Sequence, residues 1–187
     1  DKLVGEKNEA EKIRKLLFKL KKIQPDDIRQ MFFMEYKQSK ENSVQNLEIA
    51  ECSLQDAEKL FPLHISYTQE EVLPEWKKIN LALERLKLEK ILRTQKVLAV
   101  KQENSFCAKA QTNAISKNFI QIGGVFTKKE FRSKGFASCL VKKLAEEFQT
   151  ENKKSVLFVN KKNKPAICAY KKAGFEAFEK YEMLYYK

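Results

Sequence analysis

The sequence lacks several features that would mark out a particular class of protein. It has one histidine, His64, and four cysteines far apart with no CxxC pair, so we expect no metal site and no Cys–His nucleophile pair. Unpaired thiols in a chain that shows no secretory segment predict a reducing, cytoplasmic environment. No apolar run approaches the roughly 20 residues of a membrane span, so we expect no membrane partner. The cysteines are Cys52, Cys107, Cys139 and Cys168.

Acidic residues are in the minority. The chain has 25 Asp and Glu against 37 Lys and Arg, which gives a net charge of +12. Such an excess favours a phosphate-bearing ligand, but it also fits a lysine-rich surface in water, and both interpretations stay open. The lysines are scattered in pairs with acidic residues among them, whereas nucleic-acid binding needs a contiguous basic face. A nucleic-acid partner is therefore the weakest alternative.

Residues 1–45 differ from the rest and are expected to form a helix–strand extension. Apolar residues at helical spacing predict a helix over residues 9–23, which Pro25 ends. Residues 26–29 form either a turn or a short helix, and residues 31–36 form a strand. The apolar stripe of the helix comprises Ile13, Leu16, Leu17, Leu20 and Ile23.

Three interpretations of this extension remain open. It is the tail of a larger N-terminal region, an added strand of the main sheet, or a contact with a second subunit. Because an apolar stripe needs to be buried, we expect it to pack on the same chain, with a homodimer as the alternative. A polar connector over residues 37–46 then leads to the second region, residues 46–187.

The second region alternates strands and helices in the order β-α-α-β-β-β-α-β-α-β. Pro62 is expected to bend the chain after a first short helix, and Pro74 to begin a second whose face is Trp76, Ile79, Leu83 and Leu86. Central hairpins followed by helical crossovers predict an α/β fold of the α+β type, with a mixed sheet and helices on both faces. The expected strands are residues 47–52, 96–102, 106–115, 119–127, 154–160 and 178–187, and the expected helices are residues 53–60 and 74–93, one from Phe136 and one from Lys164 to Ala173.

A basic loop joins the strand over residues 119–127 to the helix that starts near Phe136. The first N–H groups of a helix have no partner within it, and they carry the positive end of its dipole. Gly135 allows a ligand to approach the backbone closely, Ala137 is small, and Arg132 and Lys134 add positive charge. The pattern R-x-x-G-x-A therefore predicts an anion site, although an ordinary basic loop would look similar.

A second motif follows in "NKPAICAYKKAGF" (163–175), which carries Asn163, Ala166, Tyr170 and Gly174. At this point the chain resembles the GNAT acetyltransferases, whose donor substrate is acetyl-CoA. "VFTKKEFRSKGFASCLVKKL" is similar to their pyrophosphate-binding motif, and "NKPAICAYKKAGF" to their N-x-x-A-x-x-x-Y-x-x-x-G-F motif. Together with "QIGGVFT", both blocks are most similar to the FR47-like branch. The resemblance covers about residues 46–187.

The resemblance implies a sheet splayed between the strands 119–127 and 154–160, with acetyl-CoA in the gap. Val125 would polarise the acyl carbonyl through its backbone, and Tyr170 would protonate the departing thiolate. From the residues alone, Tyr170 is expected to be a packed aromatic of an amphipathic helix, and it is the resemblance that favours the acid. Asn163 either caps the helix or braces this corner and touches the pantetheine arm. Lys128 or Lys129 could also meet phosphates. The resemblance assigns acetyl-CoA binding to Val125, Phe126, Thr127, Arg132, Ser133, Lys134, Gly135, Phe136, Ala137, Ser138, Asn163, Ala166 and Tyr170.

The chain departs from the family pattern in three places. Ser133 stands where glycine is common and Lys129 where proline is common. Some relatives have a glutamate on the strand that corresponds to residues 119–127, but here the inward positions are Gln121 and Gly123, which cannot accept a proton. A water chain, Glu130 or a carboxylate from the N-terminal half could act as the base, so the base stays unassigned.

The predicted function is therefore direct transfer of an acetyl group from acetyl-CoA to an amine of a small molecule or peptide. The alternative is an acyl-CoA-binding module with weak or no catalysis. The acceptor would lie against residues 54–76, where Glu70, Glu71 and Glu75 either attract an amine or are ordinary acids near a helix start.

Overall fold

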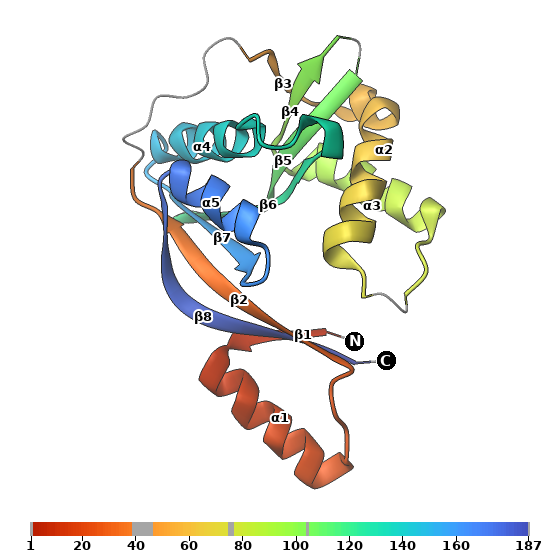
Figure 1. Ribbon diagram of the computed structural model, residues 1–187, viewed down its shortest axis with the longest axis vertical. Coiled ribbons are helices and arrows are strands. Elements are labelled where there is room, and N and C mark those ends of the chain that lie inside the picture. Colours follow the sequence, from red (N-terminus) through yellow and green to blue (C-terminus); the bar gives the residue numbers. More distant parts are fainter. Residues whose placement is uncertain (1, 39–46, 75–76, 104, 187) are drawn as a thin grey trace.

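The computed structural model describes residues 2–38, 47–74, 77–103 and 105–186 (Figure 1). The predicted connector over residues 37–46 lies mostly outside the described residues, as do Glu75 and Trp76. From residue 46 onwards, the observed order of helices and strands matches the predicted one. The strands are β1 (Lys2–Glu6), β2 (Asp27–Tyr36), β3 (Ile49–Glu51), β4 (Val97–Gln102), β5 (Ser105–Ile115), β6 (Phe119–Thr127), β7 (Lys154–Asn160) and β8 (Phe175–Tyr185). The helices are α1 (Lys7–Lys21), α2 (Ala57–Tyr67), α3 (Leu81–Thr94), α4 (Phe136–Gln149) and α5 (Lys164–Lys172), with short turns η1 (Leu54–Asp56), η2 (Thr68–Val72) and η3 (Lys129–Phe131).

The strands form one sheet in the order β1-β8-β2-β7-β6-β5-β4-β3. Within the described chain, β6 and β7 pair in parallel and every other neighbouring pair is antiparallel. The prediction of a mixed, mostly antiparallel sheet is confirmed. No helix in the described ranges is long and apolar enough to cross a membrane.

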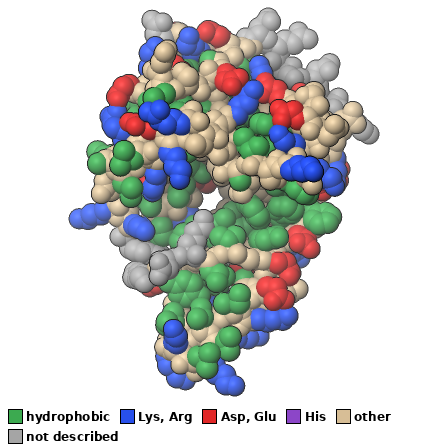
Figure 2. Space-filling model, turned by 180° about the vertical axis from the view of Figure 1, so that it is seen from behind, with side chains coloured by type: hydrophobic (Ala, Val, Ile, Leu, Met, Phe, Trp, Pro, Cys, Tyr) green, Lys and Arg blue, Asp and Glu red, His purple; other side chains and the backbone are tan. Residues whose placement is uncertain are grey.

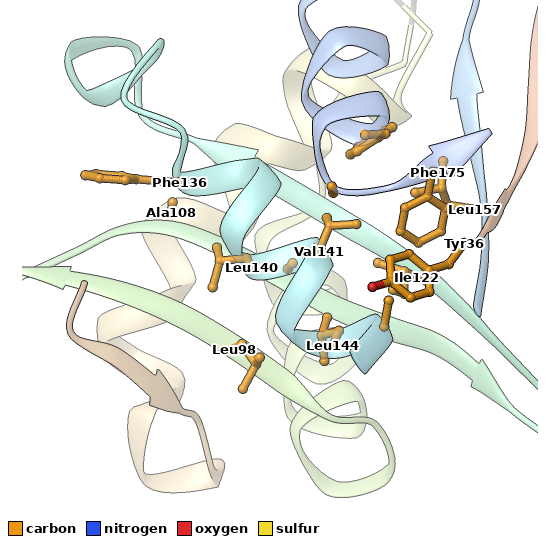
Figure 3. Packing of buried hydrophobic residues seen from close by; sticks show 14 of the residues in the cluster. Tyr36, Leu98, Ala108, Ile122, Phe136, Leu140, Val141, Leu144, Leu157 and Phe175 are labelled. Atoms are coloured by element: carbon orange, nitrogen blue, oxygen red, sulfur yellow. The ribbon is translucent and has the colours of Figure 1, made fainter. Parts of the chain in front are cut away.

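Helices cover both faces of the sheet, and the alternation along β4 shows how. Leu98 and Val100 pack in the larger apolar cluster with α4 and α5, whereas Val97 and Ala99 pack with α2 and α3 on the opposite face. Figure 3 shows Leu140, Val141 and Leu144 of α4 lying against the sheet in the larger cluster. Because successive side chains of a strand point to opposite faces, α4 and α2 pack on opposite faces of the sheet. The loop before α4 and the turn η2 after α2 therefore approach the sheet from opposite sides.

The N-terminal extension belongs to this sheet. β2 lies between β7 and β8 and pairs antiparallel with both, so the added-strand interpretation is the one observed. β2 begins at Asp27, which makes the prediction of a turn or short helix over residues 26–29 wrong. β1, which the sequence did not predict, pairs with β8. The pairing with β7 and β8 extends β2 beyond what its apolar pattern alone indicated.

Helix α1 forms as predicted, but its apolar stripe is not buried. Leu16 is 54% exposed and Leu20 is 69% exposed, and Ile13 and Ile23 are also exposed. The prediction that the stripe packs on the same chain is wrong for these four residues. Leu17 is half-buried, and Ala10 is the buried residue of this helix. Figure 2 shows apolar side chains gathered over the end of the molecule that α1 occupies.

Two predictions about proline are also wrong. Pro62 lies inside α2, which continues to Tyr67 because Leu60, Leu63 and His64 bury its inner face. Pro74 does not begin a helix: Asn80 caps α3, which starts at Leu81. The buried positions of α3 are Glu84, Leu88 and Leu92, whereas the predicted face residues Leu83 and Leu86 are exposed.

Candidate active site

Strands β6 and β7 separate part-way along their length. They pair from Phe119 with Lys154 to Ile122 with Leu157, and the described residues show no pairing between them beyond that point. On its other side β7 pairs with β2 as far as Asn160. The predicted splay is confirmed, and it leaves residues 123–127 of β6 without a partner strand on the β7 side.

The backbone of Val125 and Thr127 faces this gap. The amide of Lys128 donates to the carbonyl of Cys107 on β5 at 2.9 Å, and Phe126 stands opposite Lys109. Because alternate residues of a strand direct their N–H and C=O groups to opposite sides, Val125 and Thr127 direct theirs away from β5. The Oγ1 atom of Thr127 is buried without a hydrogen-bond partner in the described residues, which is typical of an atom that a ligand or water satisfies.

The N-terminus of α4 has the backbone geometry that the predicted anion site requires, and anion binding there remains a prediction. The helix begins at Phe136, and Gly135 is its N-cap with a φ of 81°, a left-handed conformation that glycine adopts readily. No side chain caps this end within the described chain, so the first N–H groups of α4 remain available to an anion. The hydroxyl of Ser138 donates to the carbonyl of Gly135 at 2.9 Å, and Ala137 is half-buried.

Ser133 also has a left-handed backbone, with a φ of 64°. This conformation explains the preference for glycine at this position in the family pattern, because a Cβ atom is crowded there. Serine is tolerated, and the loop keeps its close approach at Gly135.

Contacts within the protein hold the Arg132 side chain beside the gap. Its Nε donates to the carbonyl of Thr127 at 3.0 Å, its Nη2 contacts Glu70 Oε2 at 2.7 Å, and its guanidinium lies over the buried ring of Phe126. Lys134 lies over the ring of Phe131. These contacts fix where the two cations sit, and their binding to phosphate remains a prediction.

Asn163 caps α5, as one interpretation predicted. Its Oδ1 accepts from the amide of Ala166 at 3.1 Å, and its Nδ2 donates to the Glu71 carboxylate at 3.1 and 3.3 Å. Glu70 contacts Arg132 in the same way, so η2 connects the two sequence motifs. The contact of Asn163 and Ala166 with a pantetheine arm remains a prediction.

Tyr170 is 8% exposed and packs in the larger apolar cluster. Burial raises the pKa of its phenol above the ordinary range, and the nearby Tyr67 and Glu71 raise it further. Tyr170 is therefore both a packed aromatic and a hydroxyl that stays protonated beside a carboxylate.

Glu71 stands out among the acids of the predicted acceptor region. It belongs to the π-helical turn η2, a type of turn that is frequent at functional sites. Desolvation raises its pKa and Glu70 adds to the rise, while the Asn163 hydrogen bond opposes it. Arg29 of β2 donates to the carbonyls of Glu71 at 2.9 Å and Leu73 at 3.3 Å, which anchors the turn to the sheet. A cavity of about 850 Å³ opens beside these residues and is lined by Arg29, Gln69, Glu70, Glu71, Leu73, Pro74, Lys77, Lys78, Ile79 and Asn160.

The sequence analysis missed Lys109, which is fully buried on β5. Its Nζ donates to Gln111 Oε1 at 2.9 Å and to the carbonyl of Gly124 at 3.0 Å, and it lies 4.9 Å from the ring centroid of Tyr67. Burial lowers its pKa to about 7. The alternation of residues along a strand does not show which face of the sheet a lysine occupies, so nothing in the sequence signalled that Lys109 is buried.

A second buried polar group lies behind it. His64 Nε2 is 3.0 Å from Glu84 Oε2, which also accepts from Thr68 at 3.2 Å. Desolvation and the charge of Lys109 lower the pKa of His64, and the Glu84 contact opposes them. His64 is thus buried, and it pairs with a carboxylate that the sequence analysis did not single out.

Known proteins share the fold that carries this site. Residues 101–184 match the family described as FR47-like protein. A structure described as an acetyltransferase from the GNAT family, from Colwellia psychrerythraea, has a TM-score of 0.67 at 10% identity and covers 87% of this chain and 58% of its own. The structure of a Drosophila protein has a TM-score of 0.67 at 16% identity, and the match covers 96% of this chain and 58% of the Drosophila chain. A structure described as a predicted acetyltransferase with acetyl-CoA, from Clostridium acetobutylicum, has a TM-score of 0.56 at 17% identity. The match covers 71% of this chain and 92% of the Clostridium chain.

These likenesses establish the fold. The chain spans 58% of the length of the first two structures, and no curated protein matches its sequence. The predicted resemblance to FR47-like proteins is confirmed over residues 101–184.

Proposed function

We propose that this protein is an N-acetyltransferase that moves an acetyl group from acetyl-CoA directly to an amine. The proposal starts from the match to FR47-like proteins over residues 101–184 and from the fold shared with GNAT acetyltransferases. The acceptor is a small molecule or a peptide. The single observation that carries the proposal is the splayed β6–β7 gap, which opens beside the uncapped N-terminus of α4.

The residues around the gap fit acetyl-CoA. The N–H groups after Gly135 suit its pyrophosphate, with Arg132 and Lys134 as nearby cations. The unpaired edge of β6 offers main-chain groups to the pantetheine arm, and the unpartnered Oγ1 of Thr127 faces no competing protein group. Phe126 packs beneath this edge. The remaining residues proposed to bind acetyl-CoA lie at the two ends of the gap: Ser133, Phe136, Ala137 and Ser138 at the start of α4, and Asn163 and Ala166 at the start of α5.

The reaction exchanges one bond for another. The amine nitrogen forms a bond with the acetyl carbon while the carbon–sulfur bond breaks, and the Val125 N–H stabilises the charge that develops on the acetyl oxygen. The amine loses a proton and the departing thiolate gains one. Tyr170 supplies that proton. The buried phenol is a weaker acid than in water, and a thiolate formed in the same gap is also more basic than in water.

We assign the missing base to Glu71. It is on the acceptor side of the gap, its carboxylate is held by Asn163, and its raised pKa makes it a better proton acceptor than an ordinary glutamate. The proton passes from the amine to the Glu71 carboxylate either directly or through one water molecule between them.

Calorimetric titration with acetyl-CoA tests the proposal, with Gly135→Glu and Gly135→Ala as a matched pair. Both substitutions put a side chain on a left-handed backbone, but only glutamate adds negative charge at the N-terminus of α4. We expect measurable binding by the wild type and an affinity at least about tenfold weaker for Gly135→Glu than for Gly135→Ala.

Three outcomes contradict this proposal or a part of it. Absence of binding by the folded wild type rejects acetyl-CoA as the ligand. Equal affinities of the two variants place the phosphates elsewhere. Binding without thiol release across a panel of amines would identify a CoA-binding module, the alternative function.

A further inference from the structure

We propose that Lys109 is a positioning residue for acetyl transfer, whose ammonium group holds and polarises the peptide unit that joins Gly124 to Val125. The inference rests on the proposed function, and it adds a residue to which neither sequence motif points. The C=O of this peptide unit belongs to Gly124 and its N–H to Val125, so a cation on the first group acts on the second.

The local geometry of β6 makes the contact possible. Two residues of β6, Gly124 and Val125, stand opposite one residue of β5, between the pairs Gly123–Gln111 and Phe126–Lys109. Gly124 has a φ of 58°, and a Cβ atom there would lie 2.5 Å from the side chain of Gln111. The bulge therefore turns the Gly124 carbonyl out of the strand ladder, where Lys109 Nζ reaches it at 3.0 Å.

Lys109 has no carboxylate partner among the described residues. Its neighbours are the amide oxygen of Gln111, the carbonyl of Gly124 and the ring of Tyr67. A fully buried cation is costly, and a structural role alone would be served as well by an apolar residue. The ammonium thus acts on one particular peptide unit, that of the Gly124 carbonyl, in addition to the Gln111 amide.

The titratable groups that face Lys109 come from three elements. Tyr67 and His64 belong to α2, and Cys52 precedes η1. Glu84 of α3 lies behind His64 and is itself paired with Lys87 at 2.6 Å. The Glu84 carboxylate is therefore already engaged, and the Lys109 ammonium donates to two neutral acceptors, Gln111 Oε1 and the Gly124 carbonyl.

The consequence for chemistry follows from the peptide dipole. An ammonium that donates to a carbonyl strengthens hydrogen bonds made by the N–H of the same peptide unit, because linked hydrogen bonds polarise one another. The Val125 N–H faces the gap and is the proposed donor to the acetyl oxygen. Burial lowers the pKa of Lys109 to about 7, so this polarisation is strong below neutral pH and weaker above it.

Nuclear magnetic resonance of the ligand-free protein tests the inference without relying on activity. We expect the Val125 amide shift and the Lys109 Nζ signal to titrate with one midpoint near the pKa of about 7, and the Val125 shift to become flat in Lys109→Met. Lys101→Met is the matched control, since Lys101 lies on the neighbouring strand β4 and pairs with Glu48 near the surface.

Kinetics then separate positioning from a general loss of structure. In Lys109→Met we expect kcat to fall about tenfold with the calorimetric affinity for CoA unchanged, and the loss of activity above neutral pH that Lys109 causes in the wild type to disappear. A Val125 amide that does not titrate overturns the inference, and this wild-type measurement decides even where the variant does not fold. Titration in a protein that does not bind acetyl-CoA overturns the proposed function, and with it the catalytic role of Lys109.

Discussion

At the scale of single residues, Glu71 is the group on which the proposed chemistry depends most directly. Glu71→Gln keeps the shape of the side chain and an acceptor for Asn163, but it removes the proton acceptor. We expect kcat/KM to fall by about 10²- to 10³-fold with the affinity for acetyl-CoA unchanged. Activity should be measured by thiol release with the best amine found.

The pH profile of the wild type checks the same assignment. Because the pKa of Glu71 is raised, its carboxylate takes up a proton at a higher pH than an ordinary glutamate, and activity should decline as pH falls through that raised value. Glu58→Gln is the control, since Glu58 is a surface residue of α2 that pairs with Arg85. If Glu71→Gln were as active as this control, the base would have to be sought elsewhere.

The sequence described single residues well where the backbone imposes the requirement. Gly135 was recognised from its position because a left-handed helix cap favours glycine. Lys109 and His64 could not be recognised, since their burial depends on other elements that pack over them: Tyr67 of α2 lies over Lys109, and Glu84 of α3 meets His64. Glu71 was named among three acids, but only its contact with Asn163, 92 positions away, distinguishes it.

At the scale of an element, α5 allows capping to be separated from catalysis. Asn163→Ala removes both the cap of α5 and the amide that donates to Glu71, and we expect it to cost about 1 kcal/mol of unfolding free energy. Asn163→Asp retains an acceptor for the amide of Ala166 but places a second carboxylate beside Glu71.

The aspartate variant should therefore stay close to the wild type in urea unfolding, while the acidic limb of its activity profile moves to higher pH. The shift follows because a neighbouring negative charge raises the pKa of Glu71 further. Identical pH profiles for Asn163→Asp and the wild type would show that Glu71 does not govern the rate.

Helices α1 and α3 show what periodicity determines and what it leaves open. The apolar spacing predicted α1 to within two residues, yet its stripe remains exposed because no described part of the chain lies over it. In α3 the predicted face was wrong because Glu84, a residue that hydropathy assigns to the surface, turns inward to meet His64. A helical period shows that a face exists, and the surrounding elements decide whether it is covered.

At the scale of the whole molecule, β2 joins the N-terminal extension to the core while α1 stands apart from it. Met34 of β2 is fully buried, whereas Leu16 of α1 is 54% exposed. We expect Met34→Ala to cost about 2–5 kcal/mol of unfolding free energy, and Leu16→Ala to change it by no more than about 0.5 kcal/mol.

Urea unfolding followed by circular dichroism measures both values. The two substitutions remove side chains of similar size from the same forty-residue segment, so each serves as the control for the other. Equal losses would mean that α1 and β2 contribute alike to the stability of the molecule, contrary to their burial.

The sequence by itself determined the order of helices and strands from residue 46 onwards, the start of α4 at Phe136 and the two motifs that flank the gap. These features depend on local rules: spacing of apolar residues, capping, and the backbone freedom of glycine. Only the tertiary structure decided that β2 enters the sheet between β7 and β8, that Glu71 meets Asn163, and that Lys109 lies buried against Gly124. The first two of these contacts join segments distant in the chain, and the burial of Lys109 depends on α2 packing over the β5–β6 hairpin. Such packing is selected by the whole sheet and its helices.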